Sequence, residues 1–460
     1  MLRRWQSECI NLALETYLGG KQHFLTQATP GAGKTFMAAS LSKEMFDSKL
    51  IDFVICFSPS KSVAESIQRS FSRVLSCTFD GKIGTVGCSI TYQSLRHLNP
   101  KFWETLSRYR VLCIFDEIHH CSGDSETNAN SWGNSILTDV QSAARYTLAL
   151  TGTPWRSNLT PVTLASYTDP EGQIVCDYQY SLAQAIKDRV CRRPKIVLVD
   201  CHHSVVSSPE TKDSYRSMSE LIEKGKVSYS MIIQNDNALA HILSEAVSRL
   251  QKIRSVNKKA GGLIVASSVE HARYIDSILR DNFNQSTSIV TYREPNAQDL
   301  INQFRTSSTE WIVSVGMVSE GTDIPRLQIC CHLSNVKTEL YFRQILGRIL
   351  RTTTCANQEA WFYTFAEPSL NRFAEEIEND IPETCMYIKV KQDFSDYTGV
   401  LTNEVNTPFS GQGTPTISEK KLVWKSNQSE FSSPKLDTYD RTKVTLNHFK
   451  QRVIEAFRYA

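Results

Sequence analysis

Apolar segments of strand length alternate with segments of helix length in two successive series along this chain of 460 residues. Buried strands that are each followed by a helix are typical of a parallel sheet covered by helices on both faces. Because the chain is too long for one ordinary core, we predict an α/β fold with two tandem parallel-sheet domains, residues 1–185 and 186–384. The strand segments are HFLTQ, DFVICFSPS, RVLCIFDE and YTLALTGT in the first series, and PKIVLVD, GGLIVASS, TSIVTY, EWIVSVG, QICCHLS and AWFYTFA in the second.

Two regions depart from this alternation. Residues 204–260 are polar and compatible with helices, so we predict a helical insertion between the first two strands of the second domain. Residues 385–460 are rich in Ser, Thr, Asn, Pro and Gly, which favours a polar linker. At its end the segment TLNHFKQRVIEAF regains helical spacing, and we predict a C-terminal helix of unknown role. The apolar residues at that spacing are Leu446, Phe449, Val453, Ile454 and Phe457.

The composition describes a globular protein without a membrane span. Hydrophobic residues make up 41% of the chain and charged residues 22%. No apolar run is long enough to cross a bilayer, and the opening MLRRWQSECI lacks the hydrophobic segment of a signal peptide, so we expect an intracellular, cytoplasmic location. Since the net charge is only +3, nucleic-acid binding would have to come from a local surface.

The thirteen cysteines favour reduced thiols over a disulfide framework, because they show no CxxC pair and are odd in number. The clusters HHC at 119–121 and CHH at 201–203 could supply zinc ligands. Neither cluster has a partner pair at the spacing of a zinc finger, so a zinc site is disfavoured.

A phosphate-binding loop is the clearest chemical motif. The segment ATPGAGKT, residues 28–35, follows a predicted strand and precedes a predicted helix, as a P-loop does, although Ala28 stands where the strict pattern has Gly. Backbone N–H groups of such a loop surround phosphates, Lys34 reaches the β and γ oxygens, and the Thr35 hydroxyl binds Mg²⁺. The cofactors expected are therefore ATP and Mg²⁺. The residues assigned to the loop are Pro30, Gly31, Ala32, Gly33, Lys34 and Thr35.

A matching acidic pair follows another predicted strand in VLCIFDEIHH. Asp116 and Glu117 come at its carboxyl end, where functional residues of parallel sheets gather. We predict that Asp116 holds Mg²⁺ and that Glu117 orients or deprotonates the water that attacks the γ-phosphate. An acidic turn exposed to solvent is the alternative for these two residues taken alone.

The segment QILGRILR, residues 344–351, predicts a helix with one polar and one apolar side. At 100° per residue, Gln344, Arg348 and Arg351 share one face, and the leucines and isoleucines take the other. A guanidinium held rigidly by such a helix is suited to binding phosphate. A solvated helix face with two ordinary arginines is the alternative.

Five motifs together resemble a known family. ATPGAGKT, DEIHH, TGTPWR, VSEGTDIPR and YFRQILGRILR occur in the order of motifs I, II, III, V and VI of superfamily 2 helicases of the DEAD/DEAH type. The chain is similar to the branch that contains restriction-enzyme motors and phage or bacterial DNA helicases, over about residues 1–367. The resemblance implies two RecA-like domains that hydrolyse ATP between them.

The resemblance also implies roles for individual residues. Arg351 is the candidate arginine finger, and Arg348 a second γ-phosphate contact. The segment LRRWQ resembles the Q-motif region, so Gln6 is expected to contact adenine. In motif V, Asp323 is expected at the nucleotide cleft, with Gly321 allowing close approach of the backbone. Residues expected to couple the ATP site to the nucleic-acid track are His119, Thr151 and Thr153.

Nucleic-acid contacts are expected at the opposite edge of the two sheets. Hydroxyls, amides and helix N-termini grip a sugar-phosphate backbone without reading its sequence. The resemblance favours DNA over RNA and is compatible with protein partners in a multi-subunit complex. The matching residues are Ser58, Pro59, Ser60, Thr91, Tyr92, Gln93, Ser267, Ser268 and Thr322.

Two other functions were considered for the chain. A nucleotide-gated clamp would bind DNA and recruit partners without moving along it. A fused nuclease could be read from Asp396, Glu419 and Lys421 as a loose D…ExK set. The Ser, Thr, Pro and Gly between these residues favour a solvated polar segment instead.

Overall fold

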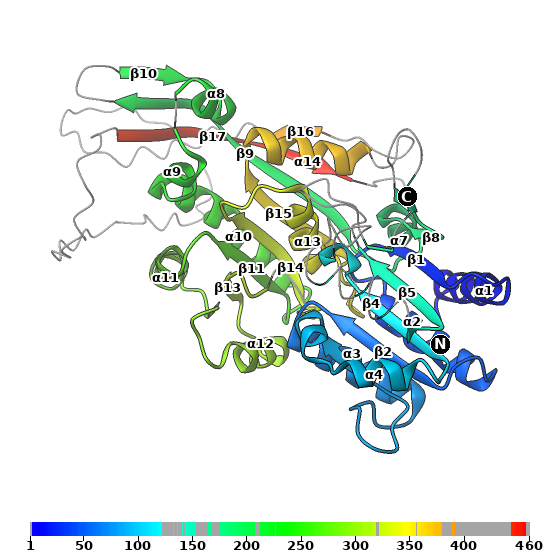
Figure 1. The fold of residues 1–460 in the computed structure, drawn as a ribbon. Helices are drawn as coiled ribbons and strands as arrows, with labels where there is room; N and C mark the ends of the chain where they lie inside the picture. The colour runs from blue at the N-terminus through cyan, green and yellow to red at the C-terminus, as the bar shows by residue number, and fades with distance from the viewer. Residues whose placement is uncertain are drawn as a thin grey trace, which may run out of the picture.

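Two β-sheets flanked by helices form the body of the molecule (Figure 1). The computed structural model describes residues 2–121, 132, 136, 140, 143–152, 163–164, 166–167, 174–207, 212–225, 227–318, 322–355, 357–379, 388–391 and 443–456. Within these residues no helix is long and apolar enough to cross a membrane. The α/β class expected from the sequence is confirmed.

The first sheet has six strands in the order β3-β2-β4-β5-β1-β8, all parallel to their neighbours. Its last strand ends at Tyr180, and the second sheet begins at Arg193. The strands are β1 (His23–Ala28), β2 (Phe53–Ser58), β3 (Gly87–Thr91), β4 (Val111–Asp116), β5 (Tyr146–Thr151) and β8 (Tyr178–Tyr180). The helices and short elements are α1 (Arg4–Leu18), α2 (Lys34–Asp47), α3 (Lys61–Leu75), η1 (Tyr92–His97), α4 (Pro100–Leu106), η2 (Ile118–His120), β6 (Ser166–Tyr167), β7 (Ile174–Val175) and α7 (Leu182–Lys187).

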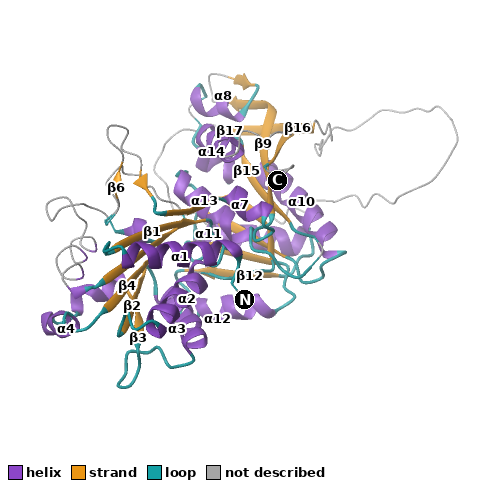
Figure 2. Ribbon diagram, turned by 90° about the vertical axis from the view of Figure 1, so that its right-hand side faces the viewer, coloured by secondary structure: helices purple, strands orange, loops and turns teal. Residues whose placement is uncertain are grey.

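Both faces of the first sheet are covered, which explains why the central strands β2, β4 and β5 are largely apolar. Successive side chains of a strand point to opposite faces, and β4 shows this clearly. Leu112 and Ile114 join the core under α1, α2 and α3, whereas Val111, Cys113 and Phe115 join the core under η1 and α4. Figure 2 shows α4 on one side of β2, β3 and β4, and α1, α2 and α3 on the other.

The second sheet has nine strands, with the path β12-β13-β11-β14-β15-β9-β17-β16 and β10 paired to β9. The strands from β12 to β9 are parallel, and β17, β16 and β10 pair antiparallel. The strands are β9 (Arg193–Ser207), β10 (Lys212–Tyr215), β11 (Gly261–Ala266), β12 (Thr287–Thr291), β13 (Trp311–Val315), β14 (Leu327–Leu333), β15 (Glu359–Phe365), β16 (Ile388–Lys391) and β17 (Lys443–Glu455). The helices are α8 (Met218–Glu223), α9 (Tyr229–Ile233), α10 (Asp236–Arg254), α11 (Val269–Ser277), η4 (Ile278–Asn282), α12 (Ala297–Thr306), α13 (Glu339–Ile349) and α14 (Pro368–Asn379).

The insertion predicted at 204–260 is helical only in its later part. β9 continues to Ser207 and pairs with β10, so the start of the insertion is a β-hairpin. The helices α8, α9 and α10 follow it. Val205 and Val206 are β-branched residues that extend the strand, and Val206 is buried.

The C-terminal helix predicted from TLNHFKQRVIEAF is wrong, because residues 443–455 form the strand β17. β17 lies antiparallel along almost the whole of β9, from Lys443 opposite Ser207 to Glu455 opposite Lys195 (Figure 1). β9 would otherwise be an edge strand with unpaired N–H and C=O groups. Pairing with this long edge outweighs a helical spacing that a short apolar pattern specifies only weakly.

Replacing Ile454 with alanine tests whether β17 is an integral part of the second domain. Ile454 is fully buried opposite Ile196, so its truncation should lower the free energy of unfolding by about 2–5 kcal/mol. Urea denaturation of the full chain measures the change. The exposed neighbour Asn447 is the control, and its replacement with alanine should change stability by less than about 0.5 kcal/mol. An equally small effect at Ile454 would mean that β17 does not pack there.

Candidate functional site

The P-loop joins β1 to α2 and is shaped by two glycines. Gly31 and Gly33 have φ angles of 84° and 96°, in the left-handed region that favours glycine. The Lys34 side chain is buried, and its Nζ donates to the backbone oxygen of Ala28 at 3.0 Å. The same Nζ lies 3.4 Å from Oε1 of Glu117. The loop thus curls around a buried ammonium group at the start of a helix, which is where phosphate binds in P-loop proteins.

The N-terminal segment braces this loop. The Gln6 side-chain amide donates to the backbone oxygen of Gly33 at 3.0 Å and accepts from the Arg3 backbone N–H at 2.8 Å. The Arg3 guanidinium donates to the backbone oxygen of Ala32 at 2.6 Å. Gln6 therefore contacts the P-loop in this structure, and its contact with adenine stays a prediction.

Asp116 and Glu117 end β4 beside the P-loop. Glu117 has a φ angle of 52°, a strained conformation for a non-glycine residue that is common at functional sites. Its Oε2 accepts the Gly152 backbone N–H at 3.1 Å and lies 3.4 Å from Nδ1 of His119. His119 Nδ1 is also 3.0 Å from the hydroxyl of Thr151. The carboxylate is thus held from three sides.

The pKa values of the two neighbouring carboxyl groups are shifted in opposite directions. Burial, and then the charge of Glu117, raise the pKa of Asp116 to about 7. Burial also acts to raise the pKa of Glu117, but the charge of Lys34 and contacts with His119 and the Gly152 N–H outweigh it, so this pKa is lowered. Glu117 is therefore an ionised hydrogen-bond acceptor.

The donor groups present at this site fit a magnesium ion. The Thr35 hydroxyl and the Asp116 carboxyl line the same cavity, and Mg²⁺ prefers oxygen ligands, few of them from protein. A bound cation would favour the ionised form of Asp116. Over the described residues, no group of three or more His, Cys, Asp or Glu is arranged to hold a metal ion, and this includes the HHC and CHH clusters.

The helix predicted over residues 344–351 ends at Ile349, so Arg348 lies on α13 and Arg351 lies two residues after its end. Both approach the P-loop from the side of the second sheet. The NH1 groups of Arg348 and Arg351 donate to the backbone oxygen of Thr322 at 2.9 and 2.8 Å. Arg351 also forms an ion pair with Asp323. A Cβ placed on Gly31 would lie 3.1 Å from Cγ of Arg351, so the arginine stem contacts the loop itself.

A second glycine sits at this contact. A Cβ on Gly347 would approach a side-chain carbon of Pro30 to 2.6 Å, closer than real Cβ atoms come. The glycine of QILGRILR is therefore required for the close approach of α13 to the P-loop. The two motifs lie far apart in the sequence and meet directly.

A cavity of about 400 Å³ lies between the two sheets at this contact. It collects nearly all of the predicted catalytic and nucleotide-binding residues in the described part of the chain. Those that line it are Pro30, Gly31, Gly33, Lys34, Thr35, Asp116, Glu117, Asp323, Gln344, Arg348 and Arg351. Ala32 is buried behind the loop, and Gly321 and Thr153 lie outside the described residues, as do Asp396, Glu419 and Lys421.

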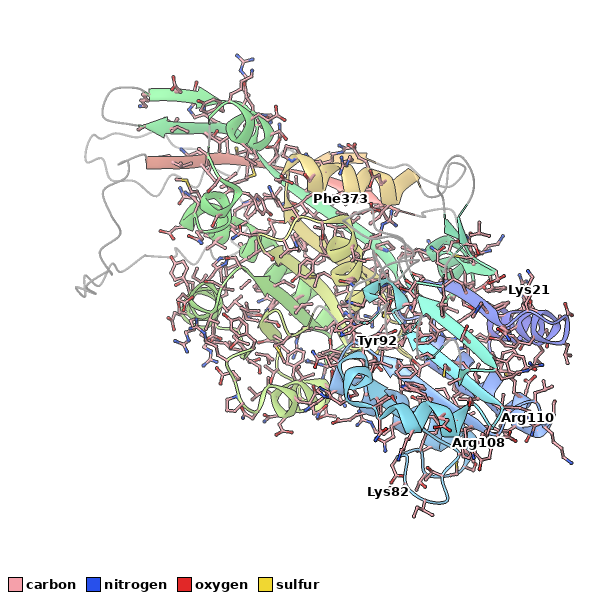
Figure 3. The ribbon with its side chains drawn as sticks, viewed as in Figure 1. Lys21, Lys82, Tyr92, Arg108, Arg110 and Phe373 are labelled. Atoms are coloured by element: carbon pink, nitrogen blue, oxygen red, sulfur yellow. The ribbon has the colours of Figure 1, made fainter. Side chains whose placement is uncertain are left out.

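Two of the residues predicted to contact nucleic acid are fully buried in the first domain instead. One is Tyr92, which Figure 3 labels. Tyr92 stacks on Trp132 and donates its hydroxyl hydrogen to the backbone oxygen of Asp116 at 2.8 Å. Ser58 is fully buried as well. The prediction of direct side-chain contacts is wrong for both, because both belong to the interior of the first domain.

The other predicted contacts divide between the cavity and the strand ends. Pro59 and Thr322 line the cavity between the sheets, not an outer edge. Ser60 and Ser268 cap the N-termini of α3 and α11. Gln93 is exposed, and Thr91 and Ser267 are partly exposed with hydroxyls 3.0 and 2.8 Å from Ser94 and His271. For these five residues a contact with nucleic acid stays a prediction.

Several cavity residues were not predicted from the sequence. Arg3, Phe36 and a group on α3 all line it. Phe36 directly follows Thr35, so its position next to the P-loop was a usable signal. The α3 residues Val63, Ser66, Ile67 and Ser70 read only as an amphipathic helix, since α3 reaches the cavity through tertiary packing.

Comparison with known proteins agrees with this site. Residues 1–156 match a family model described as "Type III restriction enzyme, res subunit". This segment contains the P-loop, DEIHH and TGTP, and the motifs expected after them line the same cavity. These findings are consistent with a helicase of superfamily 2.

Relatives of known sequence extend the likeness beyond residue 156. An uncharacterized protein of Mycobacterium leprae is 29% identical over 394 residues, 82% of this chain and 64% of the relative. The chain thus spans less than two thirds of that relative's length. The DNA 3'-5' translocase XPB2 of Sulfurisphaera tokodaii is 25% identical over 267 residues, 54% of this chain and 57% of that protein.

A solved structure shows the same fold. It is a fragment described as "a putative HsdR subunit of a type I restriction enzyme" from Vibrio vulnificus, with a TM-score of 0.54 and 18% identity. The likeness covers 81% of this chain and 65% of the other. The predicted fold of two tandem RecA-like domains is confirmed.

Proposed function

We propose that this chain is an ATP-dependent DNA translocase or helicase that hydrolyses ATP between its two domains and does not read DNA sequence. The observation that carries the proposal is the direct contact of Arg351 with the P-loop at Gly31. A site that needs groups from both domains is complete only when they meet. Binding and hydrolysis of ATP can therefore close and open the cleft, and this cycle supplies movement.

Each residue at the cavity has a role that its geometry supports. Lys34 and the backbone N–H groups of the P-loop bind the β and γ phosphates. The ionised Glu117 accepts a hydrogen bond from the attacking water and orients it toward the γ-phosphate. Arg348 and Arg351 stabilise the negative charge that develops on the transferred group. Mg²⁺, held by Thr35 and Asp116, would supply positive charge to the phosphate oxygens.

A path from the nucleotide to the rest of the first domain begins at Glu117. His119 links its carboxylate to Thr151, at the carboxyl end of β5. A change at the γ-phosphate that moves Glu117 would therefore be transmitted to the end of this strand. Ser60, Gln93 and Ser268 lie at carboxyl ends of strands or at helix N-termini, where they can bind a sugar-phosphate backbone.

DNA as the track rests on the superfamily and on relatives such as the archaeal DNA translocase. Steady-state ATP hydrolysis should be measured without polynucleotide and with single-stranded, duplex and forked DNA and RNA. We expect stimulation by at least one form of DNA, lost when Lys34 is replaced with alanine. Stimulation by RNA alone would contradict the choice of DNA. Absence of stimulation by every polymer would favour a nucleotide-gated clamp over a motor.

A further inference from the structure

Arg192 is a buried arginine at the junction between the two domains. It directly precedes β9, and its side chain is fully buried. The guanidinium donates to the backbone oxygens of Leu327, Ile349 (3.3 Å) and Pro325 (2.9 Å), and to the hydroxyl of Thr353 at 3.3 Å. Burial lowers its pKa to about 10, so the group stays charged at neutral pH.

These acceptors belong to two segments that supply the second domain's half of the cavity. Pro325 and Leu327 come two and four residues after Asp323. Ile349 and Thr353 flank Arg351. The Arg192 guanidinium thus connects two segments. One contains Thr322, whose backbone oxygen accepts hydrogen bonds from Arg348 and Arg351, and the other contains those two arginines.

The backbone around Arg192 makes further contacts with the same segments. Its N–H donates to the backbone oxygen of Leu350 at 2.6 Å, and Cys191 forms an isolated β-bridge with Arg351. The Thr352 hydroxyl donates to the backbone oxygen of Val190 at 3.2 Å. Residues 190–192 therefore run alongside the end of α13 and fix the position of Arg351, which follows the helix.

The same junction touches the first domain. Sγ of Cys191 lies 3.7 Å from the backbone oxygen of Pro30 in the P-loop. A movement of the junction relative to the P-loop would carry Arg351 with it.

We propose that Arg192 is a positioning residue for ATP hydrolysis, which locks Thr322, Asp323, Arg348 and Arg351 into one unit facing the P-loop. This role rests on the proposed function of the cavity. Arg192 does not line the cavity, so it acts through the segments that it joins. Loss of its hydrogen bonds should disturb transition-state contacts more than nucleotide binding, because the P-loop lies in the other domain.

Arg254, in the last turn of α10, offers a control in the same domain. Its guanidinium donates to the backbone oxygens of Ala260 (2.6 Å) and Ser308 (3.0 Å) and forms an ion pair with Glu310. Arg254 and these partners lie outside the segments 322–327 and 345–353. Arg192→Met and Arg254→Met therefore each remove hydrogen bonds from a guanidinium to backbone oxygens and differ in which segments those bonds hold.

The first readout is ATP hydrolysis by the full chain. Arg192→Met should lower kcat about 10- to 100-fold, with KM for ATP changed less than about threefold. Arg192→Lys keeps the charge and should recover part of kcat, whereas Arg254→Met should leave kcat of the folded protein near the wild-type value. Equal kcat values for Arg192→Met and Arg254→Met would overturn the proposal. If Arg192→Met does not fold, Arg192→Lys must still show the selective loss of kcat.

The second readout is amide hydrogen exchange, which needs no activity. Arg192→Met should speed exchange in 322–327 and 345–353, and Arg254→Met in 256–262 and 306–311. Unchanged exchange around 322–327 in Arg192→Met or Arg192→Lys would overturn the proposal. If the wild-type chain hydrolyses no ATP, the proposed function fails, and the exchange pattern alone still decides whether Arg192 holds these segments together.

Discussion

Replacing Arg351 with alanine is expected to lower kcat for ATP hydrolysis about a thousandfold, within the range for arginine fingers. The Arg351 side chain contacts the P-loop at Gly31, and its guanidinium is fixed by Thr322 and Asp323. Removing it takes away positive charge that acts on the transition state, and most nucleotide-binding groups belong to the P-loop. Steady-state hydrolysis and equilibrium binding of a fluorescent ATP analogue together measure the effect, and binding should weaken less than kcat falls.

Arg343 is the control for Arg351 because it lies on α13, the helix that ends two residues before Arg351. Its Nε donates to Glu339 at 2.7 Å, and the residue lines a different, smaller cavity. Arg343→Ala should change kcat for ATP by less than about tenfold, since it removes no charge from the nucleotide site. A similar kcat for Arg351→Ala and Arg343→Ala would rule out Arg351 as the finger.

Replacing Glu117 with glutamine should lower kcat about 10²- to 10⁴-fold, the usual contribution of a residue that activates a nucleophile. Glutamine has the same shape, so it can still accept the Gly152 N–H and remain beside Lys34. What it loses is the negative charge, which the lowered pKa of Glu117 maintains. Hydrolysis assays should therefore show loss of turnover, while ATP binding by the fluorescent analogue is retained.

Glu367 provides the matched control for this change. Its carboxylate also pairs with a lysine, Lys337 at 2.8 Å, and also accepts a backbone N–H, that of Ser369 at 2.9 Å. Glu367→Gln should alter stability and leave kcat of the folded protein near wild type. A normal kcat for Glu117→Gln would contradict its assigned role. In the clamp alternative, wild type and Glu117→Gln would recruit partners equally and neither would translocate on DNA.

The nucleotide site could be predicted from local sequence to a large extent. β4 reads as a buried strand because both of its faces are covered, and Asp116 and Glu117 follow it directly. The face shared by Gln344 and Arg348 depends only on the period of a helix. Arg351 lines the same cavity from two residues after the end of α13, so its predicted place on the helix was wrong. The residues of the nucleotide site could be predicted because each motif that identifies them is a short contiguous segment of the sequence.

The parts that failed depend on contacts between distant segments. Tyr92 follows a strand end, as a ligand contact would, but its hydroxyl satisfies a backbone oxygen of Asp116 in the core. In the sequence, Arg192 stands between Cys191 and Arg193 just before a predicted strand. Nothing near it in the sequence indicates that its hydrogen-bond partners lie beyond residue 324. The apolar pattern of residues 443–455 is compatible with a helix or a strand. These residues form a strand because they pair with the edge of β9.

The pairing of β17 with β9 has a consequence for the order in which the chain acquires its structure during synthesis. The first sheet has all of its strands once Tyr180 has been made, but β9 waits for a partner that is encoded more than half the chain later. Contacts between such distant segments form slowly, because a long loop must close first. Until residues 443–455 leave the ribosome, a growing chain carries one finished domain and one open strand edge, and that edge is where chaperones or faulty pairing between chains would act.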